Sequence, residues 1–108
     1  MDMTEKNMEL EFEQEYKNAA VKIIQNINEV KFTQLFKGYS TGEVDALLDS
    51  IINEIKLATN PGYIRQTANL NITTTFRGYS KEEVDAFLAE LEPQLETLNN
   101  INKKIREF

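Results

Sequence analysis

The side chains that could carry chemistry in this 108-residue chain are restricted, because the chain contains neither cysteine nor histidine. Thiol nucleophiles, imidazole bases, disulfides and zinc sites of the usual kind are therefore excluded. Asp45 and Asp85 form a candidate carboxylate pair, but paired acids without a histidine, a metal-ligand cluster or a phosphate-binding loop are weak evidence for catalysis. We predict a protein that is not an enzyme, with no catalytic residue, no metal and no cofactor.

Asp45 and Asp49 suit the binding of a cation better than they suit catalysis. They lie four residues apart, so a helix would place both carboxylates on one face, close enough to hold one guanidinium group in charge-assisted hydrogen bonds. The alternative is that both are solvated surface acids. The net charge of −6 favours a basic peptide as the partner. It argues against nucleic acid and against an anionic membrane surface, although a locally basic, apolar loop could still touch a membrane.

These acids belong to a sequence that occurs twice. Residues 36–49 and 76–89 are identical at nine of fourteen positions, which indicates a tandem duplication. A unit this short cannot bury its own apolar face, so it must pack against its copy or against another chain. We expect the 108 residues to form a single domain.

Each copy predicts an extended segment, a turn and then a helix. The extended segments alternate apolar with mostly polar residues, as strands do. Gly38 and Gly78 follow them, where we expect the chain to bend and a Cβ atom to be strained. A short contact between two strands is therefore compatible with the pattern.

The start of each repeat helix predicts a capping box and a hydrophobic staple. In a capping box, the N-cap serine accepts a hydrogen bond from a backbone N–H three residues on, and the glutamate there reaches back to the N–H of the serine. In a staple, the residue before the cap packs against an apolar residue in the first turn. The residues in these roles are Tyr39, Ser40, Glu43 and Val44 in the first copy and Tyr79, Ser80, Glu83 and Val84 in the second.

The other elements follow from helical periodicity and from proline. Apolar residues spaced three and four apart predict the N-terminal helix, and Pro93 must kink the second repeat helix or begin a new one. Residues 63–67 are equally compatible with a helical turn and with a loop. The expected divisions are an N-terminal helix at 4–28, repeat 1 at 29–58, a linker at 59–71, repeat 2 at 72–92 and a C-terminal helix at 93–108.

The repeated block, Phe-Lys/Arg-Gly-Tyr-Ser-x-x-Glu-Val-Asp-Ala-Leu/Phe-Leu, resembles the N-terminal domain of the DivIVA/GpsB family of Gram-positive bacteria. The resemblance covers residues 32–57 and 72–92, and repeat 2 is the closer match. Members of that family are parallel dimers in which two such units intertwine the loops before their helices and continue into a coiled coil. The resemblance implies a non-catalytic interaction module or adaptor linked to bacterial cell division or cell-wall synthesis.

The resemblance also implies two binding surfaces. One is a groove that receives an arginine from a partner's cytoplasmic tail, and the matching residues are Tyr39, Asp45 and Asp49 in repeat 1 and Tyr79 and Asp85 in repeat 2. Because position 89 is alanine, repeat 1 is the more complete groove. The other surface is a pair of loop tips that contact curved or septal membrane, matched by Phe36, Lys37, Phe76 and Arg77. Burial competes with this membrane role, since each phenylalanine continues an alternating apolar pattern and such residues are more often core.

The predicted fold class is mainly α. We expect two repeats, each a strand or loop, a glycine turn and a capped helix, to pair as an intramolecular pseudo-dimer beside the N-terminal and C-terminal helices. Swapping of the repeats across a homodimer is the alternative architecture, and a purely structural oligomerisation module is the alternative function. We expect a cytoplasmic protein, because no signal peptide and no apolar run of roughly 18 residues is found. Recruitment to the membrane or septum would follow if the loop tips bind lipid.

Overall fold

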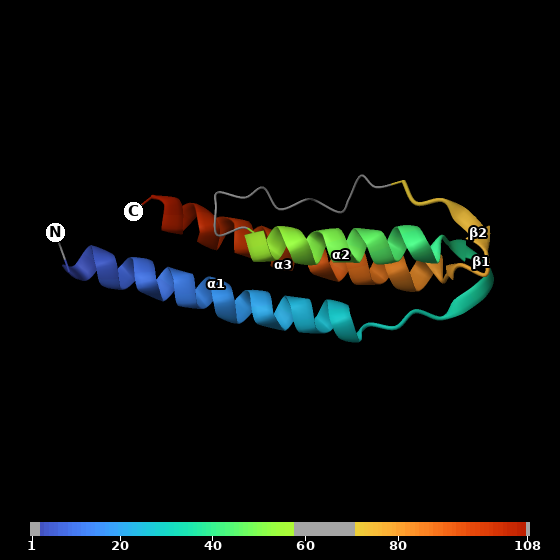
Figure 1. The fold of residues 1–108 in the computed structure, drawn as a ribbon, viewed down its shortest axis with the longest axis horizontal. Helices are drawn as coiled ribbons and strands as arrows, with labels where there is room; N and C mark the ends of the chain where they lie inside the picture. The colour runs from blue at the N-terminus through green and yellow to red at the C-terminus, as the bar shows by residue number, and fades with distance from the viewer. Residues whose placement is uncertain (1–2, 58–70, 108) are drawn as a thin grey trace.

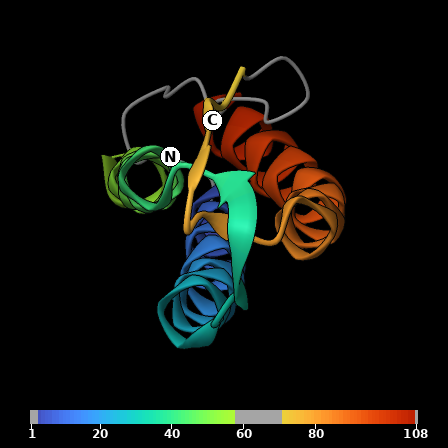
Figure 2. The same cartoon turned by 90° about the vertical axis from the view of Figure 1, so that its right-hand side faces the viewer.

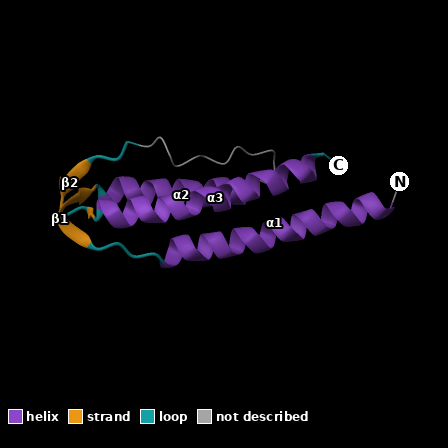
Figure 3. Ribbon diagram, turned by 180° about the vertical axis from the view of Figure 1, so that it is seen from behind, coloured by secondary structure: helices purple, strands orange, loops and turns teal. Residues whose placement is uncertain are grey.

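The computed structural model describes residues 3–57 and 71–107. Its elements, in chain order, are α1 (Met3–Glu29), β1 (Gln34–Tyr39), α2 (Thr41–Leu57), β2 (Thr74–Phe76) and α3 (Lys81–Arg106). The helices lie side by side along the long axis of a molecule that measures 61 × 22 × 18 Å, and the strands meet at one end (Figure 1). The two chain ends lie at the opposite end, as the view from behind also shows (Figure 3). The predicted mainly helical fold with a short two-stranded contact is confirmed.

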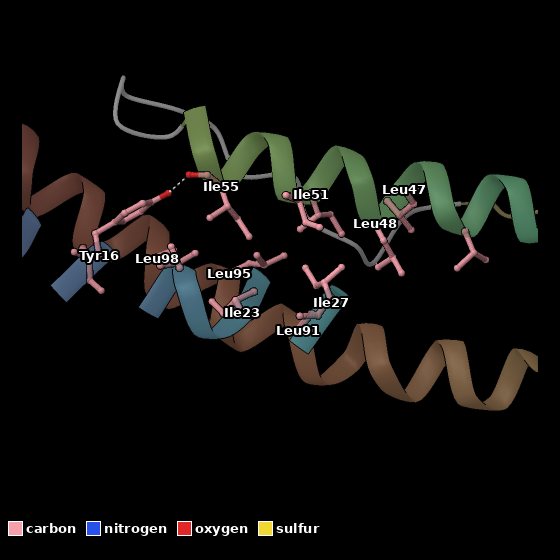
Figure 4. Close-up of a cluster of buried hydrophobic side chains, with 14 of the residues drawn as sticks. Tyr16, Ile23, Ile27, Leu47, Leu48, Ile51, Ile55, Leu91, Leu95 and Leu98 are labelled. Carbon is pink, nitrogen blue, oxygen red and sulfur yellow. Dashed lines mark hydrogen bonds between the residues drawn. The ribbon is translucent and has the colours of Figure 1, made fainter. Parts of the chain in front are cut away.

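The core lies where one apolar stripe from each helix meets the other two. Seen end-on, the helices form the corners of a triangle, and the strands cross in front of them (Figure 2). Ile51, Leu98 and Val84 are among the side chains that are almost completely enclosed, and burial of one such side chain contributes about 1.5–3 kcal/mol to folding. The close-up shows the side chains of all three helices facing one another (Figure 4).

Tyr16 joins the N-terminal helix to the end of α2. Its ring is buried in the core, and its hydroxyl donates a hydrogen bond of 2.8 Å to the carbonyl oxygen of Ile55 (Figure 4). Burial raises the pKa of Tyr16 to about 12, because the charged phenolate would be poorly solvated there. The hydrogen bond satisfies a carbonyl group in the last turn of α2, where the helix itself offers no donor.

The N-terminal helix was predicted within a residue or so at each end, but the separate C-terminal helix expected at 93–108 is not found. α3 runs without interruption from Lys81 to Arg106, with Pro93 inside it. The proline is exposed, and the side chains of Gln94 and Thr97 donate to the carbonyl oxygens of Glu90 and Pro93, each at 3.0 Å. The buried stripe continues past the proline through Leu95, so packing against α1 outweighs the lost backbone hydrogen bond.

Residues 63–67 and most of the predicted linker lie outside the described residues.

The strands pair in an antiparallel register that brings the two glycines together. Gly38 lies opposite Thr75, and Tyr39 lies opposite Thr74. A Cβ atom added to Gly38 would lie 2.6 Å from the carbonyl carbon of Gly78, and one added to Gly78 would lie 2.5 Å from the carbonyl oxygen of Tyr39. Glycine is therefore required by the close approach of two backbones.

This finding corrects the expected reason for the glycines. Among the described residues no glycine has a positive φ, and Gly38 lies within β1 rather than at a bend. The turn in the second copy falls at Arg77, which has a φ of 58°. An L-residue in this left-handed region is strained by roughly 1–2 kcal/mol.

We predict that Gly38→Ala destabilises the fold by at least about 2 kcal/mol, because the new methyl group meets backbone atoms that cannot move independently. Gly42→Ala is the matched control, since the nearest atom to its Cβ would be Ser40 Oγ at 4.0 Å. Alanine at this exposed position in α2 should leave stability unchanged or raise it by up to about 1 kcal/mol. Urea unfolding at equilibrium measures both. Equal effects of the two substitutions would contradict the close crossing.

Candidate functional site

The repeat helices begin as predicted at their serines, but their glutamates act across the repeats. Ser40 Oγ accepts from the backbone N–H of Glu43, and Ser80 Oγ accepts from that of Glu83, both at 3.3 Å. The serine half of each capping box is thus confirmed.

The glutamate half is wrong. Glu43 accepts from the backbone N–H of Thr73 at 3.1 Å, and Glu83 accepts from that of Thr33 at 3.2 Å. The N–H groups of Ser40 and Ser80 instead donate to the carbonyl oxygens of Thr73 and Thr33, at 2.7 and 2.8 Å. Because the two extended segments cross, each glutamate bonds a threonine N–H of the other copy rather than the N–H of its own N-cap serine.

The tyrosines also reach across the repeats. The Tyr39 hydroxyl donates to Asp85 Oδ1 at 2.7 Å, and the Tyr79 hydroxyl donates to Asp45 Oδ1 at 3.1 Å. The hydrogen bonds thus join each tyrosine to the aspartate of the other copy, whereas the resemblance groups Tyr39 with Asp45 and Tyr79 with Asp85. Tyr39 ends β1 and Tyr79 follows β2, and each contacts the helix of the other copy.

These contacts and burial raise the pKa of both hydroxyls. The hydrogen bond to Asp85 is the main cause that raises the pKa of Tyr39, followed by burial and by the charge of that carboxylate. Burial is the main cause that raises the pKa of Tyr79, followed by the hydrogen bond and charge of Asp45. In both cases a phenolate would lie beside a carboxylate, and the two negative charges would repel each other.

A groove with a volume of ≈ 580 Å³ lies between the end of α1 and α2, and Asp45, Asp49 and Tyr79 line it together. Both carboxylates are exposed. Among the side chains that the structure describes, those of residues 8–57 and 71–107, no lysine or arginine forms an ion pair with either of them. The complete lining is Ile27, Asn28, Val30, Lys31, Phe32, Gln34, Asp45, Leu48, Asp49, Ile52 and Tyr79.

The groove is suited to a cation because its negative groups converge from two elements. Asp45 and Asp49 come from successive turns of α2, and Ile27 and Asn28 belong to the last turn of α1. That turn contains no basic residue, so its unsatisfied carbonyl groups carry the negative end of the helix dipole. A guanidinium group entering here would meet two carboxylates on the α2 side, while the end of α1 and Lys31 form the other side.

The second copy does not repeat this arrangement. The Asp85 carboxylate accepts a hydrogen bond from the Tyr39 hydroxyl, but position 89 is Ala and adds no second carboxylate. Lys81 Nζ lies 5.4 Å from the ring centroid of Tyr39, and Lys31 lines the first groove, so each copy has a lysine of the chain nearby. The structure therefore brings Asp45, Asp49 and Tyr79 into one groove and leaves Tyr39 and Asp85 apart from it.

Sequence reasoning missed the wall that α1 contributes to the groove. Ile27 and Asn28 of α1 line the groove, as do Lys31 and Phe32 in repeat 1, and the ring of Phe32 lies 5.4 Å from that of Tyr79. The N-terminal helix belongs to neither copy, so the repeat gave no sign of where it would pack. The alternation that included Phe32 was the one available signal.

The predicted membrane-contact residues lie at the tip of the molecule, in the strands or directly after them. Phe36 is 71% exposed and Phe76 is 62% exposed. Their rings touch edge to face with centroids 4.9 Å apart, and Arg77 Cζ lies 5.6 Å from the centroid of Phe76. Lys37 is also exposed. Burial of the two phenylalanines, the competing expectation, is wrong, because the glycine crossing turns this part of both strands away from the helices.

Within the described ranges, no three acidic side chains are grouped closely enough to hold a metal ion. None of the helices described is both long enough and apolar enough to cross a membrane. Comparison with protein-family models, with curated proteins and with solved structures finds no match to this chain.

We predict that the fold loses stability as the pH rises above 10. The pKa values of Tyr39 and Tyr79 are raised from 10.0, and that of Tyr16 is raised to about 12. Their stabilising contribution is therefore complete below the unfolded-state pKa and is lost as the pH rises through the folded-state values. Urea unfolding between neutral pH and about pH 11 measures this loss.

The double variant Tyr39→Phe/Tyr79→Phe is the control for this pH dependence. It keeps both rings and removes the two hydroxyls that donate to Asp85 and Asp45, so the alkaline loss of stability should become smaller. The remaining loss is expected from Tyr16. An identical pH dependence in the variant and the unmodified protein would contradict the assigned contacts.

Proposed function

We propose that this chain is a non-catalytic protein-interaction module that captures an arginine side chain of a basic peptide in the groove at Asp45, Asp49 and Tyr79. The observation that carries the proposal is that two exposed carboxylates line one groove, with no ion pair to any described residue. An exposed acid pair at this spacing holds one guanidinium in bidentate, charge-assisted hydrogen bonds. The aromatic ring of Tyr79 adds a face on which the guanidinium plane can stack.

The proposed architecture is an intramolecular pseudo-dimer of the two copies. The reciprocal contacts support it: Tyr39 bonds Asp85 as Tyr79 bonds Asp45, and Glu43 bonds Thr73 as Glu83 bonds Thr33. In a two-fold symmetric interface, each contact from one unit to the other has a counterpart in the reverse direction. This symmetry suits a DivIVA/GpsB-like module, and the resemblance of the repeated block supports an adaptor of bacterial cell division or cell-wall synthesis in the cytoplasm.

We predict that Asp49→Asn weakens the binding of an arginine-containing basic peptide by about 10-fold to 100-fold, as expected for the loss of a charge-assisted hydrogen bond. Asp49 has no hydrogen bond to Tyr79, so this substitution leaves the tyrosine contact in place. Asp45→Ala should abolish binding, because it removes both a carboxylate and the acceptor that positions Tyr79. Isothermal titration calorimetry measures both affinities.

The matched control is Asp85→Ala, which removes the equivalent acid of the second copy outside the groove. Its affinity should equal that of the unmodified protein, and a peptide with glutamine in place of arginine should not bind. Unchanged affinity in Asp45→Ala would reject the groove. An equal loss in Asp85→Ala would show that overall negative charge, rather than this groove, attracts the peptide.

A second candidate function is contact with a membrane surface through the tip. The supporting observation is the exposed pair Phe36 and Phe76 with Lys37 and Arg77 beside it. Insertion of one phenylalanine into an apolar phase contributes about 1.5–3 kcal/mol, and each basic residue adds about 1 kcal/mol near an acidic leaflet. These contributions oppose the repulsion from the acidic remainder of the chain.

We predict that the protein co-sediments with vesicles containing acidic lipids and that Phe36→Ala/Phe76→Ala lowers the bound fraction at least about tenfold. Leu57→Ala is the matched control, because Leu57 is also 71% exposed but lies at the far end of α2. Its binding should not change. Absence of binding in the unmodified protein, or equal binding by the double variant, would reject the membrane role. If peptide binding also fails, the remaining proposal is that the repeat forms a purely structural oligomerisation module.

A further inference from the structure

The groove at Asp45, Asp49 and Tyr79 is larger than one arginine side chain requires. Its volume is ≈ 580 Å³, whereas a cavity of about 150 Å³ already holds benzene, which has more heavy atoms than a guanidinium group. A peptide whose arginine binds here therefore places neighbouring side chains in the same groove. The rest of the lining decides which neighbours fit.

Lys31 gives this lining a positive charge opposite the two carboxylates. It follows the end of α1, whereas Asp45 and Asp49 belong to α2. The Lys31 side chain is exposed, and its long, flexible stem lets the ammonium group reach toward a ligand. Among the side chains that the structure describes, this ammonium group has no ion pair and no hydrogen bond. Opposite charges thus line one groove without contacting each other.

This division of charge favours a ligand that carries both signs. A second basic residue beside the arginine would meet Lys31 as a like charge, whereas a carboxylate would meet it as a counter-charge. Like charges brought together across an interface exclude a wrong partner as effectively as attraction selects the right one. The net charge of −6 attracts any basic peptide, so the local preference set by Lys31 opposes the preference set by the whole chain.

The width of the groove sets the spacing between the two charges of the ligand. The axes of packed helices lie about 8–10 Å apart, so the α1 and α2 sides of the groove are separated by a distance of that order. An extended peptide turns every second side chain to the same face, and two residues span about 7 Å. An acidic residue two positions before or after the arginine can therefore reach the Lys31 side.

We propose that the partner of this groove is a peptide with an acidic residue two positions from its arginine, and that Lys31 selects this acid. The proposal rests on the peptide binding proposed above. The arginine binds Asp45 and Asp49 on the α2 side, and the acid pairs with Lys31 on the α1 side. The bound segment is thus mixed in charge, whatever the overall charge of the partner.

The probes are short, capped polyalanine peptides with a central arginine and Asp, Asn or Lys at one position, two residues before or after it. Titration of the isotopically labelled protein, followed by its amide signals, measures the affinities. One of the two Asp peptides should bind about two-fold to five-fold more tightly than its Asn counterpart, as expected for an exposed ion pair. Its Lys counterpart should bind most weakly. Attraction by overall negative charge alone gives the reverse order.

Substitution of Lys31 should change this order in a defined way. Lys31→Glu should invert it, so that the Lys peptide binds most tightly, and Lys31→Gln should remove the preference for Asp over Asn. Lys22→Glu is the matched control, because Lys22 is exposed on α1, does not line the groove and undergoes the same change of charge. It should keep the order found for the unmodified protein. Both lysines are exposed, so all three variants are expected to fold.

The outcomes separate this proposal from the peptide function on which it rests. If replacing the arginine by glutamine abolishes binding but neither Asp peptide binds more tightly than its Asn counterpart, the role of Lys31 is overturned and the arginine groove stands. Inversion of the order by Lys22→Glu would also overturn that role, because overall charge would then set the preference. If no peptide binds, or if binding survives the loss of the arginine, both proposals are overturned.

Discussion

The contact on which the rest of this structure depends is the close crossing of two backbones at Gly38 and Gly78. No side chain fits between the strands at this point. Because the strands can approach so closely, each extended segment reaches the helix of the other copy, and the threonine, tyrosine and glutamate contacts follow from that reach. The same crossing leaves the ends of both strands beyond the helices, so Phe36 and Phe76 have no core to enter.

The local features of the fold were accessible from the sequence, whereas the contacts between the copies were not. Helical periodicity and capping residues act within a few positions of the chain, so the helix starts at Ser40 and Ser80 could be predicted. The partner of each tyrosine depends on how two segments forty residues apart cross, and the repeat alone is equally compatible with either pairing. Pro93 was expected to kink this helix or to begin a new one, and α3 continues through it as one helix because its buried stripe packs beyond the proline.

The sequence predicted the acidic residues of the candidate site but not the other elements that line it. Asp45 and Asp49 lie four apart on one helix, so their common face followed from helix geometry. The tyrosine beside them comes from the other copy, and the end of α1 comes from a segment that is not repeated at all. Because α1 occurs once, the two halves have different surroundings, and an acid in the place of Ala89 would not by itself restore the same groove.

The strands that cross at the tip belong to one polypeptide. Their contact therefore responds to dilution differently from a contact between two chains. Two separate chains that met through such a crossing would come apart as their concentration fell, since association would be bimolecular. In a pseudo-dimer that closes within one chain, as proposed above, the contact between the copies would not depend on the amount of protein present, because it is intramolecular. A substitution in one copy also leaves the other unaltered, so the halves are free to diverge, as positions 49 and 89 have done.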